Sequence, residues 1–189
     1  ADLQELLVTN EYHDACIYGH ALEGNFHFII SQSFDSPEQV ARYEKLMDEV
    51  KTLVVDKYDG SLKAEHGTGR NMAPFVKYEW GERAYGFMKA VKELFDPKGL
   101  LNPGVIFNED PHCHLKHFKP MPLTNAHVDK CIECGFCEVN CLTCGFSLSS
   151  RQRIVIQREI SRLKKLSDTE SSERLKTLQK QYKYLGNAT

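Results

Sequence analysis

The chain has 189 residues, of which 41% are hydrophobic and 26% charged, and its formal net charge is −2 at pH 7. This length allows one or two domains with a hydrophobic core, and the near-neutral charge argues against nucleic acid as the main partner. No apolar run in the sequence approaches the roughly 18 residues that a membrane-spanning helix needs.

A β-hairpin is predicted near the N-terminus, where β-branched and aromatic residues are dense. Its strands are expected over residues 15–20 and 26–31, with the turn between Glu23 and Gly24. Such a turn would place His20 directly opposite His27, and cross-strand neighbours lie about 4.5–5.5 Å apart at Cβ. Two imidazoles so placed can chelate one divalent ion.

Two helices are predicted next, with a short strand between them. Ser36 is a suitable N-cap for a helix that apolar periodicity extends to about residue 56. Residues 61–65 are expected to form the strand. Helical periodicity resumes over residues 75–96, with a break at Gly81.

The two halves of the chain differ in character. Residues 1–110 predict an α+β domain, an antiparallel sheet with helices on one face. Residues 111–123 contain three prolines and are expected to be a linker. Residues 124–189 are expected to be wholly helical, ending in a hairpin of two helices over residues 149–166 and 168–184.

Four cysteines of the second half follow the pattern C-x2-C-x2-C-x3-C: Cys131, Cys134, Cys137 and Cys141. Three thiols at this spacing can wrap one face of an iron–sulfur cube, and in two-cluster ferredoxins the fourth ligates the other cluster. A zinc site usually has a second ligand pair a dozen or more residues away, which is absent here. We interpret the motif as a 4Fe-4S site, with zinc or plain buried cysteines as alternatives.

The cysteine pattern also indicates what the chain lacks. No cysteine follows Cys144, and the chain opens without Met, so we interpret it as a piece of a longer polypeptide. Leu142 stands where the motif usually has proline, which leaves Cys141 and Cys144 both open as the fourth ligand. Clustering of five of the seven cysteines points to a metal site in a reducing compartment. Outside the cluster we expect a buried and a surface thiol, respectively, at two positions: Cys16 and Cys113.

A second candidate site joins the hairpin to the predicted strand. Glu65 could add a carboxylate to His20 and His27, and two histidines with one carboxylate are a typical catalytic metal set. His66 would face the other side of its strand and could act as a general base without ligating the metal. The alternative is that these histidines are individually packed or exposed.

These residues resemble motifs of the FAD-linked 2-hydroxyacid dehydrogenases, such as D-lactate and D-2-hydroxyglutarate dehydrogenases and the flavin subunit of glycolate oxidase. Residues 19–27 match G-H-x-x-D/E-G-N-x-H, residues 65–69 match E-H-G-x-G, and residues 96–104 match D-P-x-x-I/L-L/M-N-P-G. The likeness covers roughly residues 10–110. The chain most resembles large members in which the flavin domain continues into a ferredoxin-like domain.

The resemblance implies a role for each matched residue. Those that would ligate a divalent Zn, Mn or Fe ion are His20, His27 and Glu65. His66 matches the base that takes the hydroxyl proton during hydride transfer to the flavin. Asn25 matches a polar residue near substrate and flavin, and Asn102 lies in a segment that approaches the flavin. From chemistry alone, Arg70 could pair with a substrate carboxylate.

The function implied by the resemblance is oxidation of a D-2-hydroxy acid, with electrons passing from FAD through 4Fe-4S clusters to a quinone or another electron carrier. The family's nucleotide-binding domain is absent, so the FAD site should lie mostly outside this chain, which alone should be inactive. A cytoplasmic location is expected, with peripheral association of the full-length protein at the inner face of the membrane as a second option.

Two other classes of function stay open. One is a non-catalytic iron–sulfur electron-transfer or assembly module with a structural His/Glu metal site, which would have no use for the unligated His66. The other is an interaction module organised by zinc on the cysteines.

Overall fold

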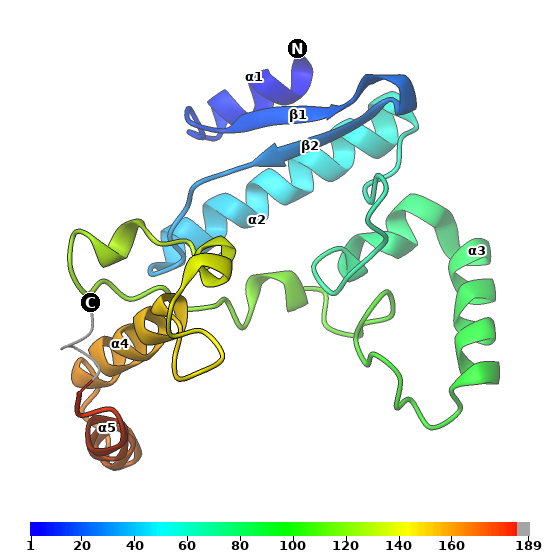
Figure 1. Cartoon of the computed structure of the whole chain (residues 1–189). Coiled ribbons are helices and arrows are strands. Elements are labelled where there is room, and N and C mark those ends of the chain that lie inside the picture. The colour runs from blue at the N-terminus through cyan, green and yellow to red at the C-terminus, as the bar shows by residue number, and fades with distance from the viewer. Residues whose placement is uncertain (185–189) are drawn as a thin grey trace. The chain divides into compact units, whose positions relative to one another are not determined.

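The computed structural model describes residues 1–184, and the chain divides into two compact units, Ala1–Phe118 and Lys119–Thr189 (Figure 1). The boundary falls inside the segment expected as a linker. The start of that segment belongs to the first unit, because the ring of Phe118 stacks on that of Phe34 with centroids 3.9 Å apart. Among the described residues, no helix is both long and apolar enough to cross a membrane.

The predicted hairpin is confirmed. Strands β1 (Cys16–His20) and β2 (Asn25–Ile29) form a two-stranded antiparallel sheet. A 3₁₀ turn over Ala21–Glu23 and Gly24 joins them, so the connection is four residues long. Gly24 has a φ of 64°, a left-handed conformation that glycine adopts without the steric cost of a Cβ.

The register of the hairpin differs from the one expected. His20 pairs with Asn25, and Tyr18 pairs with His27, so the prediction that His20 lies directly opposite His27 is wrong. The reason is the four-residue connection, which replaces a tight turn between Glu23 and Gly24. Because the pairing shifts by two residues, and side chains alternate with a period of two, both imidazoles still lie on the same face.

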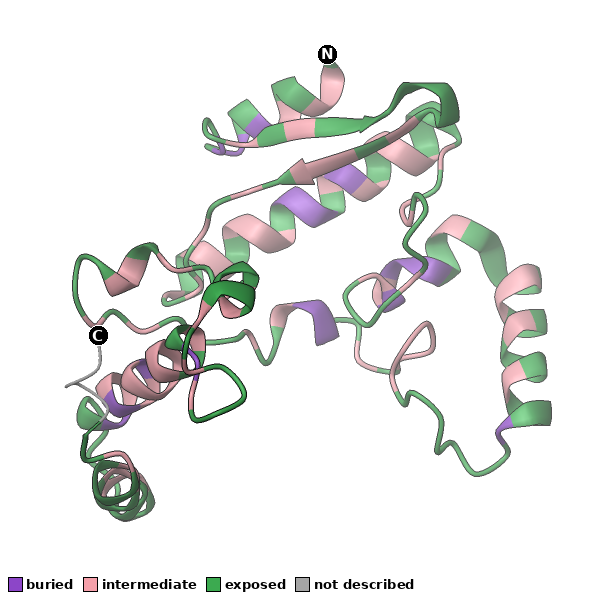
Figure 2. Ribbon diagram, viewed as in Figure 1, coloured by how far each residue is buried: buried purple, intermediate pink, exposed green. Residues whose placement is uncertain are grey.

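The core of the first unit lies where the hairpin meets α1 (Asp2–Thr9) and α2 (Pro37–Thr52). Figure 1 shows the hairpin running along α2, and Figure 2 shows buried residues on α2. The inner face of the hairpin contributes Ile17 and Phe28. The buried members of this core are Leu7, Tyr12, Leu46 and Val50. The sheet has only two strands among the described residues, so the unit is more helical than expected.

Local sequence signals account for α2. The Ser36 hydroxyl accepts a hydrogen bond from the Gln39 N–H, and the Gln39 side chain accepts one from the Ser36 N–H. This capping box satisfies two donors that a helix N-terminus leaves free. Helical turns continue through a π-helical segment, Leu53–Lys57, in agreement with the predicted end near residue 56.

The strand predicted over residues 61–65 is wrong, because this segment consists of turns. Ala64 has a φ of 44°, which interrupts an extended backbone. The Leu62 N–H donates to the Glu79 carboxylate at 3.1 Å instead of to a neighbouring strand. The segment after Asp59 is therefore a loop fastened to α3 (Ala73–Phe95).

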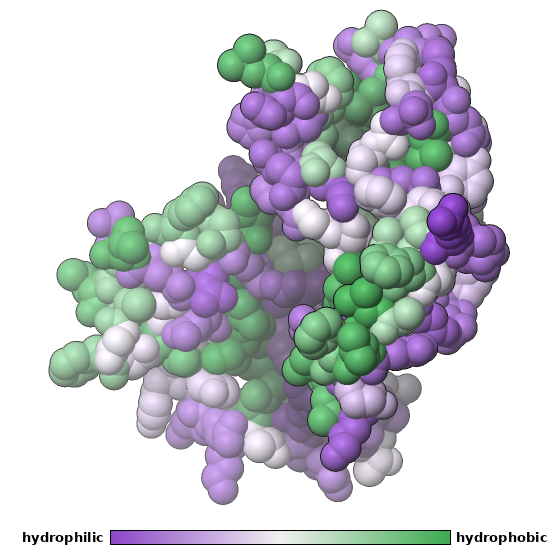
Figure 3. All heavy atoms as spheres, turned by 90° about the vertical axis from the view of Figure 1, so that its right-hand side faces the viewer, coloured by the Kyte–Doolittle hydropathy of each residue, from purple (hydrophilic) through white to green (hydrophobic). Residues whose placement is uncertain are grey.

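Helix α3 has the break predicted at Gly81, where φ is 73° and ψ is 167°. A residue with a Cβ rarely adopts this conformation, so the glycine allows two helical pieces to join at a kink. Figure 3 looks onto the side that carries α3. Beyond the kink, the helix exposes several large apolar side chains: Phe87, Val91, Leu94 and Phe95.

The second unit is helical only in its later part. Helices α4 (Ser150–Lys164) and α5 (Thr169–Gln181) pack against each other, which confirms the predicted helical hairpin. The expectation of a wholly helical segment is wrong before residue 149, where two 3₁₀ turns stand among loops. Glu133 and Gly135 have φ values of 59° and 84°, which a right-handed helix cannot include.

Gly19 is required by a close approach inside the hairpin, since a Cβ there would lie 2.1 Å from the carbonyl oxygen of Asn25. We expect Gly19→Ala to lower the free energy of unfolding by about 1–3 kcal/mol, measured by urea denaturation. Gly86→Ala is the control, because a Cβ at Gly86 in α3 meets no atom within 4 Å and should be neutral or slightly stabilising. Equal stability of the two variants would contradict this packing.

Candidate metal and substrate site

Three side chains converge at the outer face of the hairpin. The Nε2 atoms of His20 and His27 each lie 3.1 Å from Oε1 of Glu65. One possible ligand atom from each residue lies within 4.8 Å of the other two. Within residues 1–184, this is the one group of three or more histidine, cysteine, aspartate or glutamate residues with that geometry. Two imidazoles and one carboxylate therefore face a common point.

Strand alternation explains why the imidazoles point outward. Ile17 and Phe28 face the core, so His20 and His27, which are an odd number of positions away on their strands, face the opposite side. Glu65 reaches the same point from the loop that precedes α3. The hairpin thus supplies two ligands on one rigid element, and the loop supplies the third.

Asn25 ties the two parts of this group together. Its Oδ1 accepts a hydrogen bond from the His20 N–H at 3.0 Å, and its Nδ2 donates to Oε2 of Glu65 at 3.5 Å. The amide therefore orients the carboxylate while bracing the end of β1. Sequence reasoning did not single out Tyr18, whose ring stacks on that of His27 with centroids 5.3 Å apart. No local sequence signal could have found it, because the contact depends on the hairpin register, in which Tyr18 lies opposite His27.

The charge of the group suits a cation. Burial raises the pKa of Glu65, but the imidazoles of His20 and His66 and the hydrogen bond with His27 outweigh this effect, so the pKa is lowered overall. The carboxylate is accordingly ionised at neutral pH. The Glu65 side chain is 41% exposed and that of His20 is 60% exposed, which leaves an open side for another ligand. Nitrogen and oxygen donors in this number fit a divalent Zn, Mn or Fe ion.

His66 lies beside this group but outside it. Its Nε2 is 3.4 Å from Oε1 of Glu65, and its ring meets that of His27 edge-on with centroids 5.1 Å apart. The expected separation of His66 from Glu65 by strand alternation is wrong, because both residues lie in a loop. The side chain of His66 is 75% exposed, so a small molecule bound at the three ligands could reach it.

Arg70 and Asn102 share a second neighbourhood. The guanidinium of Arg70 donates to the carbonyl of Pro103 at 3.4 Å, which joins it to the segment that holds Asn102. Among residues 1–184, no hydrogen bond or ion pair joins Arg70 to His20, His27 or Glu65. The predicted environments of the two isolated thiols are reversed. Cys16 is exposed on the outer face of the hairpin, and Cys113 is buried with its thiol donating to the carbonyl of Arg70 at 3.3 Å.

The turn before Asn102 is organised by Asp96. Its carboxylate accepts hydrogen bonds from the N–H groups of Leu100 and Leu101, both at 2.8 Å, and from the ammonium of Lys92. The Lys92 hydrogen bond and the Leu101 and Leu100 N–H groups lower the pKa of Asp96 from 3.8 to about 2, against a smaller opposing effect of burial. The Asp-Pro motif thus sets the path of the segment that follows.

This depressed pKa predicts a pH dependence of stability. A carboxylate with a lower pKa in the folded state stabilises the fold above its unfolded pKa of 3.8, and that contribution is lost as the pH falls through about 2. We expect Asp96→Asn to have a smaller loss of unfolding free energy between about pH 4 and pH 2 than the wild type, measured by denaturant titration at each pH. The exposed Asp14→Asn variant is the control, and parallel curves for all three proteins would contradict the role of Asp96.

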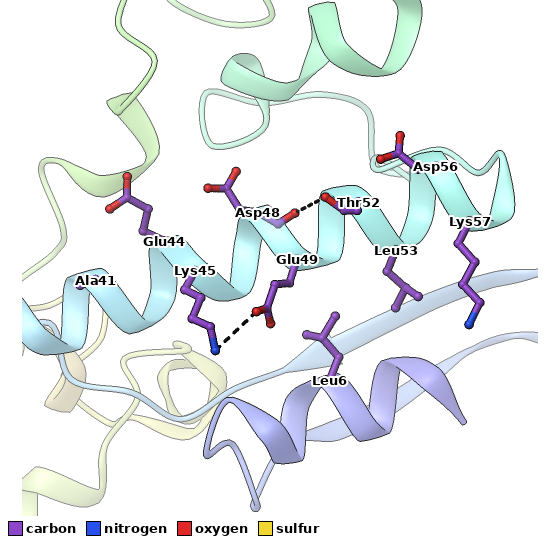
Figure 4. A pocket seen from close by; sticks show the side chains of 10 residues that line it. All are labelled: Leu6, Ala41, Glu44, Lys45, Asp48, Glu49, Thr52, Leu53, Asp56 and Lys57. Carbon is purple, nitrogen blue, oxygen red and sulfur yellow. Dashed lines mark hydrogen bonds and ion pairs between the residues drawn. The ribbon is translucent and has the colours of Figure 1, made fainter.

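A separate groove of about 830 Å³ runs along α2 (Figure 4). Its charged lining includes the ion pair between Lys45 and Glu49, and Leu6 faces it from α1. Its lining residues do not include His20, His27 or Glu65. The groove therefore has no part in the candidate site.

The cysteine segment presents unpaired thiols, since all seven cysteines are free. The Glu133 N–H donates to the sulfur of Cys131 at 3.3 Å. Hydrogen bonds from Thr143 and Ser150 lower the pKa of Cys141 to about 6. The thiols that surround a four-iron cube lie farther apart than the ligands of a single ion. The cysteine sulfurs are therefore not expected to converge as closely as the ligand atoms of His20, His27 and Glu65. Free thiols with hydrogen-bond donors to sulfur fit an iron–sulfur cluster chemically.

Comparison with known proteins identifies the class. Residues 1–106 match the family described as FAD linked oxidases, C-terminal domain. The match covers more than half of the chain, which therefore belongs to this family. The resemblance read from the motifs is confirmed at that level. No solved structure matches the chain.

Curated relatives share about a third of their residues with this chain over the matched part. Glycolate oxidase subunit GlcD of Bacillus subtilis is 32% identical over 95 residues, covering 50% of this chain and 20% of the relative. D-2-hydroxyglutarate dehydrogenase of Stutzerimonas stutzeri is 36% identical over 107 residues, covering 54% and 23%. Mitochondrial D-lactate dehydrogenase [cytochrome] 1 of Saccharomyces cerevisiae is 33% identical over 96 residues, covering 51% and 16%. The matched part of the chain thus spans only about a fifth of the length of these relatives.

Proposed function

We propose that this chain supplies the metal- and substrate-binding side of an FAD-linked dehydrogenase that oxidises a D-2-hydroxy acid. The observation that carries the proposal is the convergence of His20, His27 and Glu65 on one point with His66 beside them. The names of the relatives support it, since they refer to glycolate, D-2-hydroxyglutarate and D-lactate. All three are small 2-hydroxy acids.

The proposal gives each of these residues a role that its position supports. When bound, the flavin supplies the hydride acceptor and the divalent ion supplies Lewis acidity at the substrate hydroxyl. His20, His27 and Glu65 would hold the ion, with Asn25 fixing the carboxylate through its amide. His66 would then take the hydroxyl proton at an imidazole nitrogen as the C–H bond is broken.

Two further residues would act from the neighbouring segment. Arg70 offers a guanidinium that could pair with the substrate carboxylate, and its hydrogen bond to Pro103 places it beside the segment of Asn102. We propose that this segment approaches the flavin. Its path is set by the Asp96 turn, so a disturbance there should affect the substrate side and the flavin side together.

We further propose that electrons leave through a 4Fe-4S cluster held in part by three cysteines of the second unit: Cys131, Cys134 and Cys137. The unpaired thiols and the hydrogen bond to the sulfur of Cys131 support this assignment. The fourth ligand, whether Cys141, Cys144 or a cysteine outside this chain, decides which cluster arrangement forms. A quinone or another electron carrier would accept the electrons.

The test uses the full-length protein that contains this chain. Its FAD, iron and divalent metal contents are measured, and dye reduction is followed with D-lactate, glycolate and D-2-hydroxyglutarate, each against the L-enantiomer where one exists. The proposal expects reduction by at least one of these acids and none by the L-forms. A protein that carries FAD and metal but reduces dye with none of them would favour the non-catalytic electron-transfer module.

A further inference from the structure

Arg158 is a charged side chain buried on α4, with only 4% of its surface exposed. Its Nη1 donates to Oε1 of Glu133 at 2.7 Å, and its Nη2 donates to the carbonyl of Cys131 at 2.7 Å and to that of Val128 at 3.2 Å. One guanidinium therefore binds the cysteine loop at three points. Removing such a partner leaves other buried polar groups unpaired.

Glu133 is equally enclosed, with 3% of its side chain exposed. Its second oxygen pairs with the ammonium of Lys119, so both carboxylate oxygens are engaged. A buried ion pair is weak evidence for stability, because apolar residues of similar volume often serve as well. The arrangement is better explained by what it does to the backbone of the loop.

The backbone of Glu133 has a φ of 59°, a conformation that is uncommon for residues other than glycine. Such residues persist where their surroundings hold them, as Arg158 and Lys119 do here. The consequence is local and chemical: in this conformation the Glu133 N–H donates to the sulfur of Cys131 at 3.3 Å.

We propose that Arg158 and Glu133 are positioning residues for the iron–sulfur site: they hold the loop of Cys131 in its ligating conformation and aim the Glu133 N–H at the cysteine sulfur. This inference rests on the proposed function, in which Cys131 is a cluster ligand. Partners one step removed from a metal commonly change its affinity about 10–100-fold when mutated. Hydrogen bonds to sulfur also help set the reduction potential of iron–sulfur clusters.

The direction of the effect on potential follows from charge. Reduction adds an electron to the cluster, and a donor aimed at a ligating sulfur stabilises the more negative state. Loss of the Glu133 N–H bond should therefore move the midpoint potential to a more negative value. A residue that only stabilised the fold would leave the potential of the assembled cluster unchanged.

The variants separate the side chain from the backbone conformation. Glu133→Ala and Glu133→Gly both remove the carboxylate, but only glycine adopts a φ near 59° without steric cost. Arg158→Gln removes the guanidinium. Arg158→Lys keeps a positive charge, but its ammonium can reach only some of the three acceptors, which are the Glu133 carboxylate and the carbonyls of Val128 and Cys131. Arg162→Gln is the matched control, since Arg162 lies one turn further along α4 and pairs with Glu159 instead.

The experiment reconstitutes the full-length protein anaerobically with ferrous iron and sulfide. Iron content, electron paramagnetic resonance, the midpoint potential and the rate of iron loss to a chelator are measured, with far-ultraviolet circular dichroism of each apoprotein as a check of folding. We expect Glu133→Ala and Arg158→Gln to lose iron about tenfold faster or more and to have a more negative potential. Glu133→Gly and Arg158→Lys should lie between these variants and the wild type, and Arg162→Gln should match the wild type.

The outcomes distinguish this inference from the proposed function. If the wild-type protein assembles a cluster and all variants keep its midpoint potential and its rate of iron loss, Arg158 and Glu133 do not position the site. The inference is then overturned, while the assignment of the cluster stands. If folded wild-type protein assembles no cluster, the assignment of the cysteines fails and the inference fails with it. If Glu133→Ala and Glu133→Gly change the midpoint potential and the rate of iron loss equally, the backbone conformation of Glu133 is not what matters. The inference that this conformation aims the N–H at the sulfur is then overturned.

Discussion

Replacement of His66 by alanine in the full-length protein is expected to lower kcat by about 10²–10⁴-fold, because the substrate hydroxyl would lose its proton acceptor. The bound metal should be retained, since His66 lies outside the group of three converging ligand atoms. Steady-state kinetics with the preferred hydroxy acid and metal analysis of the same sample measure both quantities.

The exposed His13 offers a matched control, because it is not part of the cluster of His20, His27 and Glu65. His13→Ala should retain wild-type kcat. Near-normal turnover of His66→Ala would remove this residue from the proposed mechanism. Loss of metal together with activity would instead make His66 a fourth ligand. Its Nε2 lies 3.4 Å from the Glu65 carboxylate, so it is close enough for such a role.

Replacement of His27 by alanine, or of Glu65 by glutamine, is expected to abolish metal binding and activity together. Each residue supplies one of three donors, and His27 is the most enclosed of them, with 16% of its side chain exposed. Loss of one of three protein ligands should weaken binding more than the roughly 10–100-fold change typical of outer partners. Metal content after dialysis and kcat/KM are the measurements.

Treatment of the wild-type protein with a chelator provides the second arm of this test. Activity should fall with the content of divalent metal and return on addition of Zn, Mn or Fe, which shows which of these ions can support the reaction. Binding should also weaken as the pH is lowered, because ligating imidazoles must be neutral. Full activity in metal-free protein would leave His20, His27 and Glu65 without the role proposed for them.

Much of the candidate site could be predicted from local sequence. His20 and His27 lie an odd number of residues apart across a turn, with apolar residues at alternate positions. Because side chains alternate between the two faces of a hairpin, a shift of the strand pairing by two residues leaves both histidines on the same face. The shift from the expected pairing therefore left His20 and His27 on a common face. Helix caps at Ser36 and Ser149 depend on neighbours three residues away, so they too were readable.

Contacts between distant segments could not be derived from local patterns; side-chain chemistry and the family resemblance grouped Glu65 with His20 and His27, but they did not give the backbone path that brings these residues together. Glu65 lies 45 residues from His20, and the loop that brings it there has no strand periodicity. A strand needs a partner with free N–H and C=O groups, and the Leu62 N–H is bound by the Glu79 side chain instead. Burial of Cys113, and exposure of Cys16, likewise followed from packing that no local pattern records.

The sequence by itself determined which chemical groups are present and which faces of local elements carry them: the imidazoles of the hairpin, the thiols at three-residue spacing and the capped helices of the second unit. These features depend on interactions within a few residues, whose geometry is nearly independent of the rest of the chain. Only the tertiary structure decided the placement of Glu65 and His66 beside the hairpin and of Arg158 on the cysteine loop. Such contacts join residues far apart in the chain, and packing around the buried core, not local propensity, selects among the many pairings that the sequence allows.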